Sequence, residues 1–395
     1  MSVDDPIVIA SYARTPMAGL LGDFASVSAP ELGAAAVRAA VERSGVGAGF
    51  IDRIYMGCVL PAGLGQAPAR QAALAAGLPR SVQATTINKM CGSGMQAAIM
   101  ATEALAAGAA DVIVAGGMES MTNAPYLLPK HRAGARVGHD AVKDSMFLDG
   151  LEDAYELGTL MGVFAENNVR KFGFTRQEQD AYAVKSLARA NKAIAEGLFE
   201  DEITPVEVAV RGGSKCIEVD EQPGKAKPEK IPTLKPAFAS DGTVTPANSS
   251  SISDGAAALV FTRASVAEKR GLTVCARVVA SACHAHEPGD FPSAPVPATR
   301  KVLEAAGWSL EDVDLFEVNE AFAVVAMIAM KELGIPHDRI NVNGGACALG
   351  HPIGASGARI LVTLLAALKQ RKLQRGVAAI CLGGGEATAM ALELA

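Results

Sequence analysis

Residues 91–117 read CGSGMQAAIMATEALAAGAADVIVAGG, and residues 354–384 repeat the same arrangement as GASGARILVTLLAALKQRKLQRGVAAICLGG. Each stretch runs from a Ser-Gly pair through a helix-like segment and a β-like segment to a Gly-Gly pair. The second stretch is four residues longer, in the charged connection that precedes its β-like segment. A repeat of this kind indicates a duplicated α/β half.

A second, shorter repeat supports the duplication. Gly45 stands seven residues before Asp52, Gly307 stands seven residues before Asp314, and each pair leads into a β-like run. Because both repeats occur in the same order, we infer two α/β halves related by a pseudo-twofold axis. Equivalent turns can meet at such an axis, so the turn at Cys91 and the glycine-rich turn of the second half are candidates for one shared site.

The pattern between the repeats divides the chain into three parts. Apolar β-like runs alternate with helix-like runs through the first 120 residues, which predicts an α/β fold with mostly parallel strands and helices on both faces. The next segment differs, because it holds two charged helix-like runs and a proline-broken, lysine-rich stretch, QPGKAKPEK. We predict an N-terminal half at 1–120 plus 253–273, an inserted loop domain at 121–252, and a C-terminal half at 274–395.

The composition narrows the class of protein. The chain has 395 residues, of which 50% are hydrophobic and 20% charged, with a formal net charge of −6 and no block of like charge. The negative net charge and the lack of a block of basic residues argue against nucleic acid as a partner. Seven cysteines without CxxC spacing favour reduced thiols. No secretory signal, no peroxisomal C-terminal tripeptide and no apolar run of membrane-spanning length is apparent, so we expect a soluble cytoplasmic protein with no membrane partner.

Four stretches place reactive or polar side chains among small residues. They are NKMCGSG at 88–94, VNEAFA at 318–323, NVNGGACALGHPIGASGAR at 341–359 and CLGGG at 381–385.

Cys91, Cys381 and His351 are the strongest candidates for chemistry in these stretches. The two cysteines end β-like runs and adjoin glycines, and α/β proteins bind ligands at strand ends. A packed cysteine needs no glycines around it, whereas a nucleophile at a sharp turn does. His351 lies between a glycine and a proline in an open turn. Glu320 has an apolar context and is expected to orient a neighbouring group through a hydrogen bond.

Other motifs have a simpler interpretation. Packing is the better explanation for the remaining cysteines of apolar context, since free cysteine is among the most buried residue types; these are Cys58, Cys216, Cys275 and Cys347. GSGMQA at 92–97 matches a dinucleotide-binding pattern weakly, but Asp111 begins the next β-like run instead of ending it. CHAHE at 283–287 groups three metal-ligand types without a partner cluster, so we predict no metal site.

Taken together, these stretches resemble the thiolase family over essentially the whole chain. Three further stretches carry the resemblance: YARTPMAGLLG at 12–22, AGGMESM at 115–121 and DGTVTPANSSSISDGAAALV at 241–260. The sequence NEAF at 319–322 is similar to that of the ordinary thiolases and differs from the HDCF of the sterol-carrier type. The resemblance implies a layered αβαβα fold in which the insert lies over the active site and serves coenzyme A binding and oligomerisation. It also implies a homotetramer built as a dimer of dimers.

The implied activity is the reversible Claisen condensation of two acetyl-CoA molecules to acetoacetyl-CoA and CoA. By resemblance, Cys91 is the nucleophile that becomes acetylated and His351 is its base. Cys381 removes a proton from the methyl group of the second acetyl-CoA. Asn319 holds a water that, with His351, faces the enolate oxygen, and the backbone N–H groups of Cys91 and Gly383 face the tetrahedral intermediate.

The resemblance implies CoA thioesters as substrates and no tightly bound cofactor. The matching CoA-binding positions are Ser250, Met161, Phe238 and Phe322. Pro223 stands where the family has an arginine near the nucleotide, so Lys225, Lys227 or Lys230 is expected to replace it. Leu160 and Phe291 also depart from the family pattern.

Three other functions remain possible at the level of sequence. A longer-chain 3-ketoacyl-CoA thiolase of fatty-acid β-oxidation would use the same catalytic residues. A CoA-binding or scaffold protein without catalysis is opposed by the intact set of catalytic residue types. A decarboxylating ketoacyl synthase is opposed by Cys381, because such enzymes use a Cys-His-His or Cys-His-Asn set. The acyl-chain limit, the physiological direction and the pathway are left open.

Overall fold

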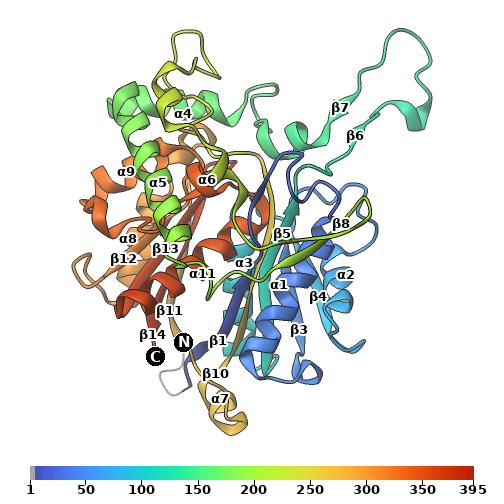
Figure 1. The fold of residues 1–395 in the computed structure, drawn as a ribbon, viewed down its shortest axis with the longest axis vertical. Coiled ribbons are helices and arrows are strands. Elements are labelled where there is room, and N and C mark those ends of the chain that lie inside the picture. Colours follow the sequence, from blue (N-terminus) through green and yellow to red (C-terminus); the bar gives the residue numbers. More distant parts are fainter. Residues whose placement is uncertain (1–4) are drawn as a thin grey trace.

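The structure is a computed structural model, and it describes residues 5–395 (Figure 1). The N-terminal half comprises β1 (Ile7–Arg14), β2 (Ala18–Gly19), α1 (Ala29–Ser44), β3 (Arg53–Gly57), α2 (Pro68–Ala75), β4 (Gln83–Ile87), α3 (Ser93–Ala106), β5 (Val112–Ser120), β10 (Ser253–Arg263) and α7 (Ala264–Arg270). The C-terminal half comprises β11 (Ala276–Ala285), α8 (Pro295–Ala306), β12 (Leu315–Val318), α9 (Ala323–Leu333), α10 (Ala346–Leu349), α11 (Ile353–Arg371), β13 (Arg375–Leu382) and β14 (Glu386–Leu394).

The segment between β5 and β10 has little sheet of its own. It contains β6 (Tyr126–Leu127), β7 (Lys143–Asp144), α4 (Met161–Phe172), α5 (Arg176–Ala195), β8 (Val206–Val210), β9 (Gly213–Ile217) and α6 (Glu221–Lys225). A π-helical turn lies at Phe147–Leu151, and 3₁₀ turns lie at Ala48–Phe50, His131–Ala133, Pro228–Thr233, Pro288–Ser293 and His337–Arg339.

The main sheet shows the duplication directly. Its strand order is β12-β13-β14-β11-β1-β10-β5-β3-β4, and β1 and β11 join the two halves through a short antiparallel contact. On either side of that junction, β10, β5 and β3 mirror β14, β13 and β12. The duplicated α/β fold predicted from the repeats is therefore confirmed. In the second half, the counterpart of β4 is reduced to an isolated parallel bridge between Phe316 and Ile340.

The expectation of mostly parallel strands is confirmed for the first 120 residues but does not extend to the whole sheet. There β3 pairs in parallel with β4 and β5, and β1 runs in the same direction as β5 because each pairs antiparallel with β10. Only β3 with its neighbours β4 and β5, and β12 with β13, pair in parallel along this path, whereas β1, β10 and β14 pair antiparallel on both sides. Strand–helix–strand alternation indicates parallel pairing only where a helix makes the crossover. The turn between β13 and β14 is too short for a crossover, so those two strands form a hairpin and must be antiparallel.

Helices and sheet halves form alternating layers. In the N-terminal half, α1 packs on β1, β5 and β10, and α2 packs on β4. In the C-terminal half, α8 packs on β11 and β14. The central helices α3 and α11 pack against each other and against strands of both halves, and their apolar side chains form one buried cluster with those strands. This is the αβαβα arrangement that the family resemblance implied.

The Ser-Gly pairs of the repeat are explained where α3 meets α11. A Cβ atom on Gly94 would lie 2.8 Å from the backbone nitrogen of Ala358, and one on Gly357 would lie 2.5 Å from that of Met95. Since no side chain fits at either position, glycine lets the two helices cross at close range near their N-termini. This crossing brings together the turns that precede the helices.

Asp52 and Asp314 also have the same role in both halves. Asp52 accepts hydrogen bonds from the backbone N–H groups of Asp111 and Val112 at the start of β5. Asp314 accepts the equivalent bonds from Gln374 and Arg375 at the start of β13. Each carboxylate thus fixes the start of the strand that leads to the active-site edge.

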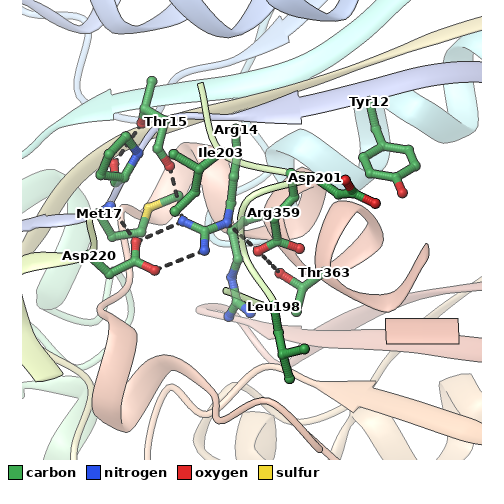
Figure 2. Close-up of polar contacts among 12 residues, drawn as sticks. Tyr12, Arg14, Thr15, Met17, Leu198, Asp201, Ile203, Asp220, Arg359 and Thr363 are labelled. Carbon is green, nitrogen blue, oxygen red and sulfur yellow. Dashed lines mark hydrogen bonds and ion pairs between the residues drawn. The ribbon is translucent and has the colours of Figure 1, made fainter. Parts of the chain in front are cut away.

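A buried ionic cluster ties the segment 121–252 to both halves (Figure 2). The guanidinium of Arg14 donates to Glu202 at 2.6 Å and forms a bidentate pair with Asp220 at 2.7 and 2.8 Å. Thr363 of α11 donates to Glu202 at 3.3 Å. Burial lowers the pKa of Arg14, but the two carboxylates more than offset this effect, so its pKa lies above the usual range.

Glu320 provides a second link, as its apolar context suggested. Its carboxylate accepts hydrogen bonds from Tyr182 and Ser186 of α5 at 2.9 and 2.8 Å, and from Asn341 and the backbone of Cys347. The carboxylate therefore holds α5 against the glycine-rich turn of the C-terminal half.

Among the helices of residues 5–395, none is long and apolar enough to span a membrane.

Candidate active site

The turn that carries Cys91 is stabilised by its own side chains. The backbone N–H of Lys89 donates to Ser93 Oγ at 2.8 Å, and Ser93 Oγ donates to the carbonyl of Met90 at 2.6 Å. Met90 has φ of 46°, a left-handed conformation that is unfavourable for a residue with a side chain. This strained turn places Cys91 directly before the N-terminus of α3.

Cys91 opens into an apolar cavity of about 390 Å³ between the two halves and the segment 121–252. His351 and Gly383 from the C-terminal half reach the same cavity. The apolar lining comes mainly from the inserted segment and from Phe291 and Phe322. The structure thus brings the predicted nucleophile, its predicted base and a predicted backbone donor together in one enclosed space.

The electrostatic environment favours the protonated form of the Cys91 thiol. Burial raises the pKa of Cys91 to about 11, although hydrogen bonds from the backbone N–H groups of Gly383 and of Cys91 itself oppose the rise. These two N–H groups converge on the sulfur. They therefore also lie near the carbonyl oxygen of any acyl group that the sulfur carries. The thiol needs a base before it can act as a nucleophile.

His351 has the properties of that base. Its Nδ1 contacts Ser356 Oγ at 2.5 Å, and Ser356 Oγ donates to the carbonyl of Pro352 at 2.9 Å. Because the serine proton is used in that bond, Nδ1–H of His351 must be the donor to Oγ, which leaves a lone pair on Nε2. Burial and then the charge of Arg359 lower the pKa of His351 to about 3, so the ring is neutral at neutral pH.

Asn319 lies beside His351, at the end of β12. Its side-chain nitrogen is 3.5 Å from His351 Nε2, and its side-chain oxygen is 3.5 Å from Arg359 of α11. Arg359 is fully buried and also faces Glu317 at 3.7 Å. The guanidinium therefore determines which end of the Asn319 amide points at the histidine.

Cys381 is buried near Cys91, at the end of β13. Burial, followed by the neighbouring Cys91 sulfur, raises the pKa of Cys381 well above the usual value for a thiol. The charge effect of Cys91 means that the two sulfurs lie close together. Two thiols of different exposure, one that lines the cavity and one that is buried beside it in the fold without lining it, suit two different roles.

The predicted CoA-binding residues fall into two groups. Ser250, Met161, Phe238 and Phe322 line the cavity with Cys91. Lys225 and Lys230 do not line it. The ammonium of Lys225 is instead paired with Glu221 on the same helix, α6.

Other cavity residues were not singled out from the sequence. They are Phe147, Gly150, Leu151, Gly162, Ala237, Pro246, Ser249, Ser251, Ile252, Ala321 and Ile353. Most belong to irregular segments whose apolar residues follow no period, so no pattern marks them. Several others lie within stretches quoted for different reasons: Ile353 and Ala321 in stretches with reactive residues, and the residues from Pro246 to Ile252 in the stretch 241–260 that carries the family resemblance.

The CHAHE motif has no clustered partners. The Cys283 thiol approaches Gln96 Oε1 at 3.8 Å, and His286 Nε2 is 2.9 Å from the carbonyl oxygen of Asp290. Within residues 5–395, no group of three or more metal-ligand side chains is positioned to hold an ion.

The comparisons with known proteins agree with this geometry. Residues 7–265 match the family described as Thiolase, N-terminal domain, and residues 272–394 match Thiolase, C-terminal domain. An acetyl-CoA acetyltransferase of Pseudomonas aeruginosa is 48% identical over 388 residues, 98% of each chain. Acetyl-CoA acetyltransferase 2 of Arabidopsis thaliana is 48% identical over 392 residues, 98% of this chain and 97% of its own.

Solved structures are similar over the same length. The crystal structure of the Bacillus anthracis acetyl-CoA acetyltransferase has a TM-score of 0.96 and 40% identity, covering 99% of both chains. A thiolase from Ascaris suum in complex with coenzyme A has a TM-score of 0.94 and 42% identity, covering 99% of this chain and 100% of its own. By sequence, fold and the arrangement of its cysteines and histidine, this chain belongs to the thiolase family.

Proposed function

We propose that the chain catalyses the reversible condensation of two acetyl-CoA molecules to acetoacetyl-CoA and CoA. The observation that carries the proposal is the convergence of Cys91, His351 and the Gly383 N–H on one apolar cavity, with Cys381 buried near Cys91. The relatives named above are acetyl-CoA acetyltransferases, which supports acetyl-CoA as the substrate. The apolar lining fits the pantetheine arm, and the bound coenzyme A of the Ascaris suum thiolase supports a CoA thioester in this space.

The first half-reaction transfers an acetyl group to Cys91. His351 Nε2 takes the thiol proton, and the thiolate attacks the thioester carbonyl of acetyl-CoA. The negative oxygen of the tetrahedral intermediate accepts hydrogen bonds from the N–H groups of Cys91 and Gly383. When the intermediate collapses, the CoA sulfur leaves and takes the proton of Cys381, which is left as a thiolate.

The second half-reaction forms the carbon–carbon bond. The Cys381 thiolate removes a methyl proton from a second acetyl-CoA, and the enolate oxygen faces the protonated His351 and a water held by Asn319. The enolate carbon attacks the acetyl carbonyl on Cys91. Acetoacetyl-CoA is released as the Cys91 sulfur leaves, and His351 returns its proton to that sulfur. The protein ends in its starting protonation state, as catalysis requires.

The reaction can be tested in the thiolysis direction. The purified chain is mixed with CoA and either acetoacetyl-CoA or a longer 3-ketoacyl-CoA, and kcat/KM is compared. We expect a clear preference for acetoacetyl-CoA. A preference for the longer substrate would assign the chain to the β-oxidation thiolases, and no activity with either would leave only CoA binding.

We further propose that the chain assembles as a homotetramer and acts in the cytoplasm. The hairpin of β6 and β7 supports the assembly, because it extends from the body of the fold and exposes apolar side chains (Figure 1). Val137 is 96% exposed and Tyr126 is 69% exposed. Large apolar side chains in such positions suit a protein interface. Light scattering of the intact chain and of a Tyr126→Ser/Val137→Ser variant tests the proposal, which predicts a smaller species for the variant.

A further inference from the structure

The glycine run after Cys381 supplies a backbone donor but little rigidity. Gly383, Gly384 and Gly385 connect β13 to β14, and the last two have φ of 94° and 84°. A Cβ atom on Gly384 would meet nothing within 4 Å, whereas one on Gly385 would lie 2.4 Å from the carbonyl oxygen of His286, whose N–H donates to the Gly385 carbonyl at 2.9 Å. The run is therefore anchored at Gly385, but Gly383 and Gly384 keep the conformational freedom of glycine and do not by themselves fix where the Gly383 N–H points.

Glu386 ends this run and reaches across to the other half of the molecule. Its carboxylate forms an ion pair with Lys89 at 2.5 Å, with side chains 38% and 27% exposed respectively. Lys89 is two residues before Cys91 in the strained turn. The pair therefore joins the turn that carries the nucleophile to the turn that carries its backbone donor.

Close packing between the same two turns supports a shared position. A Cβ atom on Gly92 would lie 2.6 Å from Leu382 Cδ2, so the Cys91 turn rests directly on the end of β13. The methyl group of Met90 lies 3.7 Å from the Cβ position of Gly383. These contacts limit how near the turns can come, whereas the ion pair limits how far apart they can move.

The N-terminal half has a carboxylate at the equivalent position. Counted from the Gly-Gly pair of each repeat, Glu119 corresponds to Glu386. Glu119 is fully buried and accepts hydrogen bonds from the backbone N–H groups of Val59, Leu60 and Gly354, the last at 2.8 Å. Gly354 lies three residues after His351. Each half thus uses the same position to hold the catalytic turn of the other half.

We propose that Lys89 and Glu386 are positioning residues that hold the Gly383 N–H over the Cys91 sulfur. Neither side chain lines the cavity, so both act through the turns that they join. The proposal rests on the proposed function, because it concerns the donor for the acyl oxygen on Cys91. Loss of the pair should slow formation of acetyl-Cys91 without weakening acetyl-CoA binding.

The experiment measures the rate of Cys91 acetylation by acetyl-CoA. The full chain is mixed with acetyl-CoA, samples are quenched after set times, and the acetylated fraction is read by intact-protein mass spectrometry. We expect Lys89→Met and Glu386→Gln each to lower this rate and kcat by about three- to ten-fold, since small misplacements of a catalytic group are costly. The KM for acetyl-CoA and the melting temperature should stay near those of the wild type. Lys89→Arg, which keeps the charge, should retain most of the rate.

The pair predicts a specific pattern among combined variants. Lys89→Met/Glu386→Gln should be no slower than either single variant, because the two side chains act as one unit. The exchanged pair Lys89→Glu/Glu386→Lys should recover part of the lost rate. Lys369→Met is the matched control, since it removes an exposed ion pair with Asp201 away from the cavity, and it should leave the rate unchanged.

Two results would overturn the inference. One is a wild-type rate in both single variants, and the other is a double variant whose loss equals the product of the single losses. A lower acetylation rate together with a clearly lower melting temperature in the same variant would assign the pair a merely structural role. If the wild-type chain itself forms no acetyl-Cys91, the proposed function fails instead.

Discussion

The Gly-Gly pair inside β5 and the one that follows β13 occupy equivalent positions in the repeat but serve different purposes. A Cβ atom on Gly117 would lie 2.0 Å from the carbonyl oxygen of Gly354, at the start of α11. A Cβ atom on Gly383 would meet only the side chains of Met161 and Met90, at 3.5 and 3.7 Å, on the cavity side. In the first half glycine permits close packing, and in the second half it leaves room for a ligand.

The turns before α3 and α11 diverge in the same way. The first presents Cys91, which needs activation, and the second presents His351, which is neutral and can provide it. The duplicated fold brings both turns to one place. The site is reactive because the two turns carry different side chains, a thiol in one and a base in the other. A structural duplication therefore does not imply that either half has chemistry of its own.

The largest effect is expected when the nucleophile of the first half is removed. Cys91→Ser should fold, yet lose roughly three or more orders of magnitude in kcat, because a hydroxyl is far less acidic than a thiol and the residue acts as part of a unit. Intact-protein mass spectrometry of the wild type should show one acetyl group per chain, located on Cys91 by peptide mapping. An acetyl group on any other cysteine would contradict the assignment of Cys91 as the nucleophile that the first half contributes.

Cys381 should be required for only one of the two half-reactions. We expect Cys381→Ala to accept an acetyl group on Cys91, while condensation falls by about 10²-fold or more, as for loss of a general acid–base group. Single-turnover acetylation and steady-state condensation, measured on the same preparation, separate the two. Near wild-type condensation in this variant would mean that Cys381 is only packed.

Glu119 predicts a pH dependence of stability in the first half. Burial raises its pKa to about 7 from a usual value of 4.5, although three backbone N–H groups oppose the rise. Between these pH values the unfolded carboxyl group has lost its proton and the native one has kept it. The unfolded state then binds fewer protons, so the free energy of unfolding falls as pH rises, by at most roughly 3 kcal/mol, and is constant above pH 7.

Glu119→Gln is the matched variant for this dependence, since its amide does not titrate. Urea unfolding at several pH values should give a free energy of unfolding that falls as pH rises in the wild type and falls less steeply in the variant. Parallel curves for the two proteins would mean that Glu119 titrates near its usual pKa and that its burial has little energetic effect.

Much of this arrangement could be predicted from the sequence, for a definite reason. Cys91, His351 and Cys381 stand out because glycines surround each of them, and the duplication shows in the spacing of Asp52 and Asp314. The directions of β10 and β14 were not predictable in the same way, because β14 follows β13 through a short turn and β10 follows β5 only after the long segment 121–252. The pairing of Glu386 with Lys89 was not predicted either, since nearly 300 positions separate them in sequence.

Paired substitutions of Gly117 and Gly383 test whether the two glycines differ in purpose. Gly117→Ala should destabilise the fold by about 1–3 kcal/mol or more, because its Cβ meets backbone that cannot move aside. Gly383→Ala should leave the melting temperature nearly unchanged and lower kcat/KM by about ten-fold, because its Cβ enters the acyl space. Equal losses of stability in the two variants would show that both glycines serve packing alone.

The smallest effect is expected outside both halves, in the lysine-rich stretch of the inserted segment. CoA carries phosphates at its nucleotide end, and an ammonium group acts on them as a point charge. Exposed ion pairs contribute only about 0.2–1 kcal/mol each, so replacing Lys225, Lys227 and Lys230 together by alanine should raise the KM for acetyl-CoA several-fold. The kcat should hardly change, because these contacts are equal in the ground and transition states.

The pairing of Lys225 with Glu221 makes the contributions of the three lysines unequal. Lys225 would have to leave its carboxylate before it could contact a phosphate, so we expect Lys230 and Lys227 to carry more of the effect. Lys192→Ala is the control, because Lys192 is an exposed lysine paired with Glu196 on a helix in the same way. Added salt should raise the wild-type KM toward that of the triple variant, since it screens exposed charges. An unchanged KM in the triple variant at low ionic strength would mean that these lysines only solvate the loop, and phosphate recognition would then have to come from elsewhere on the surface.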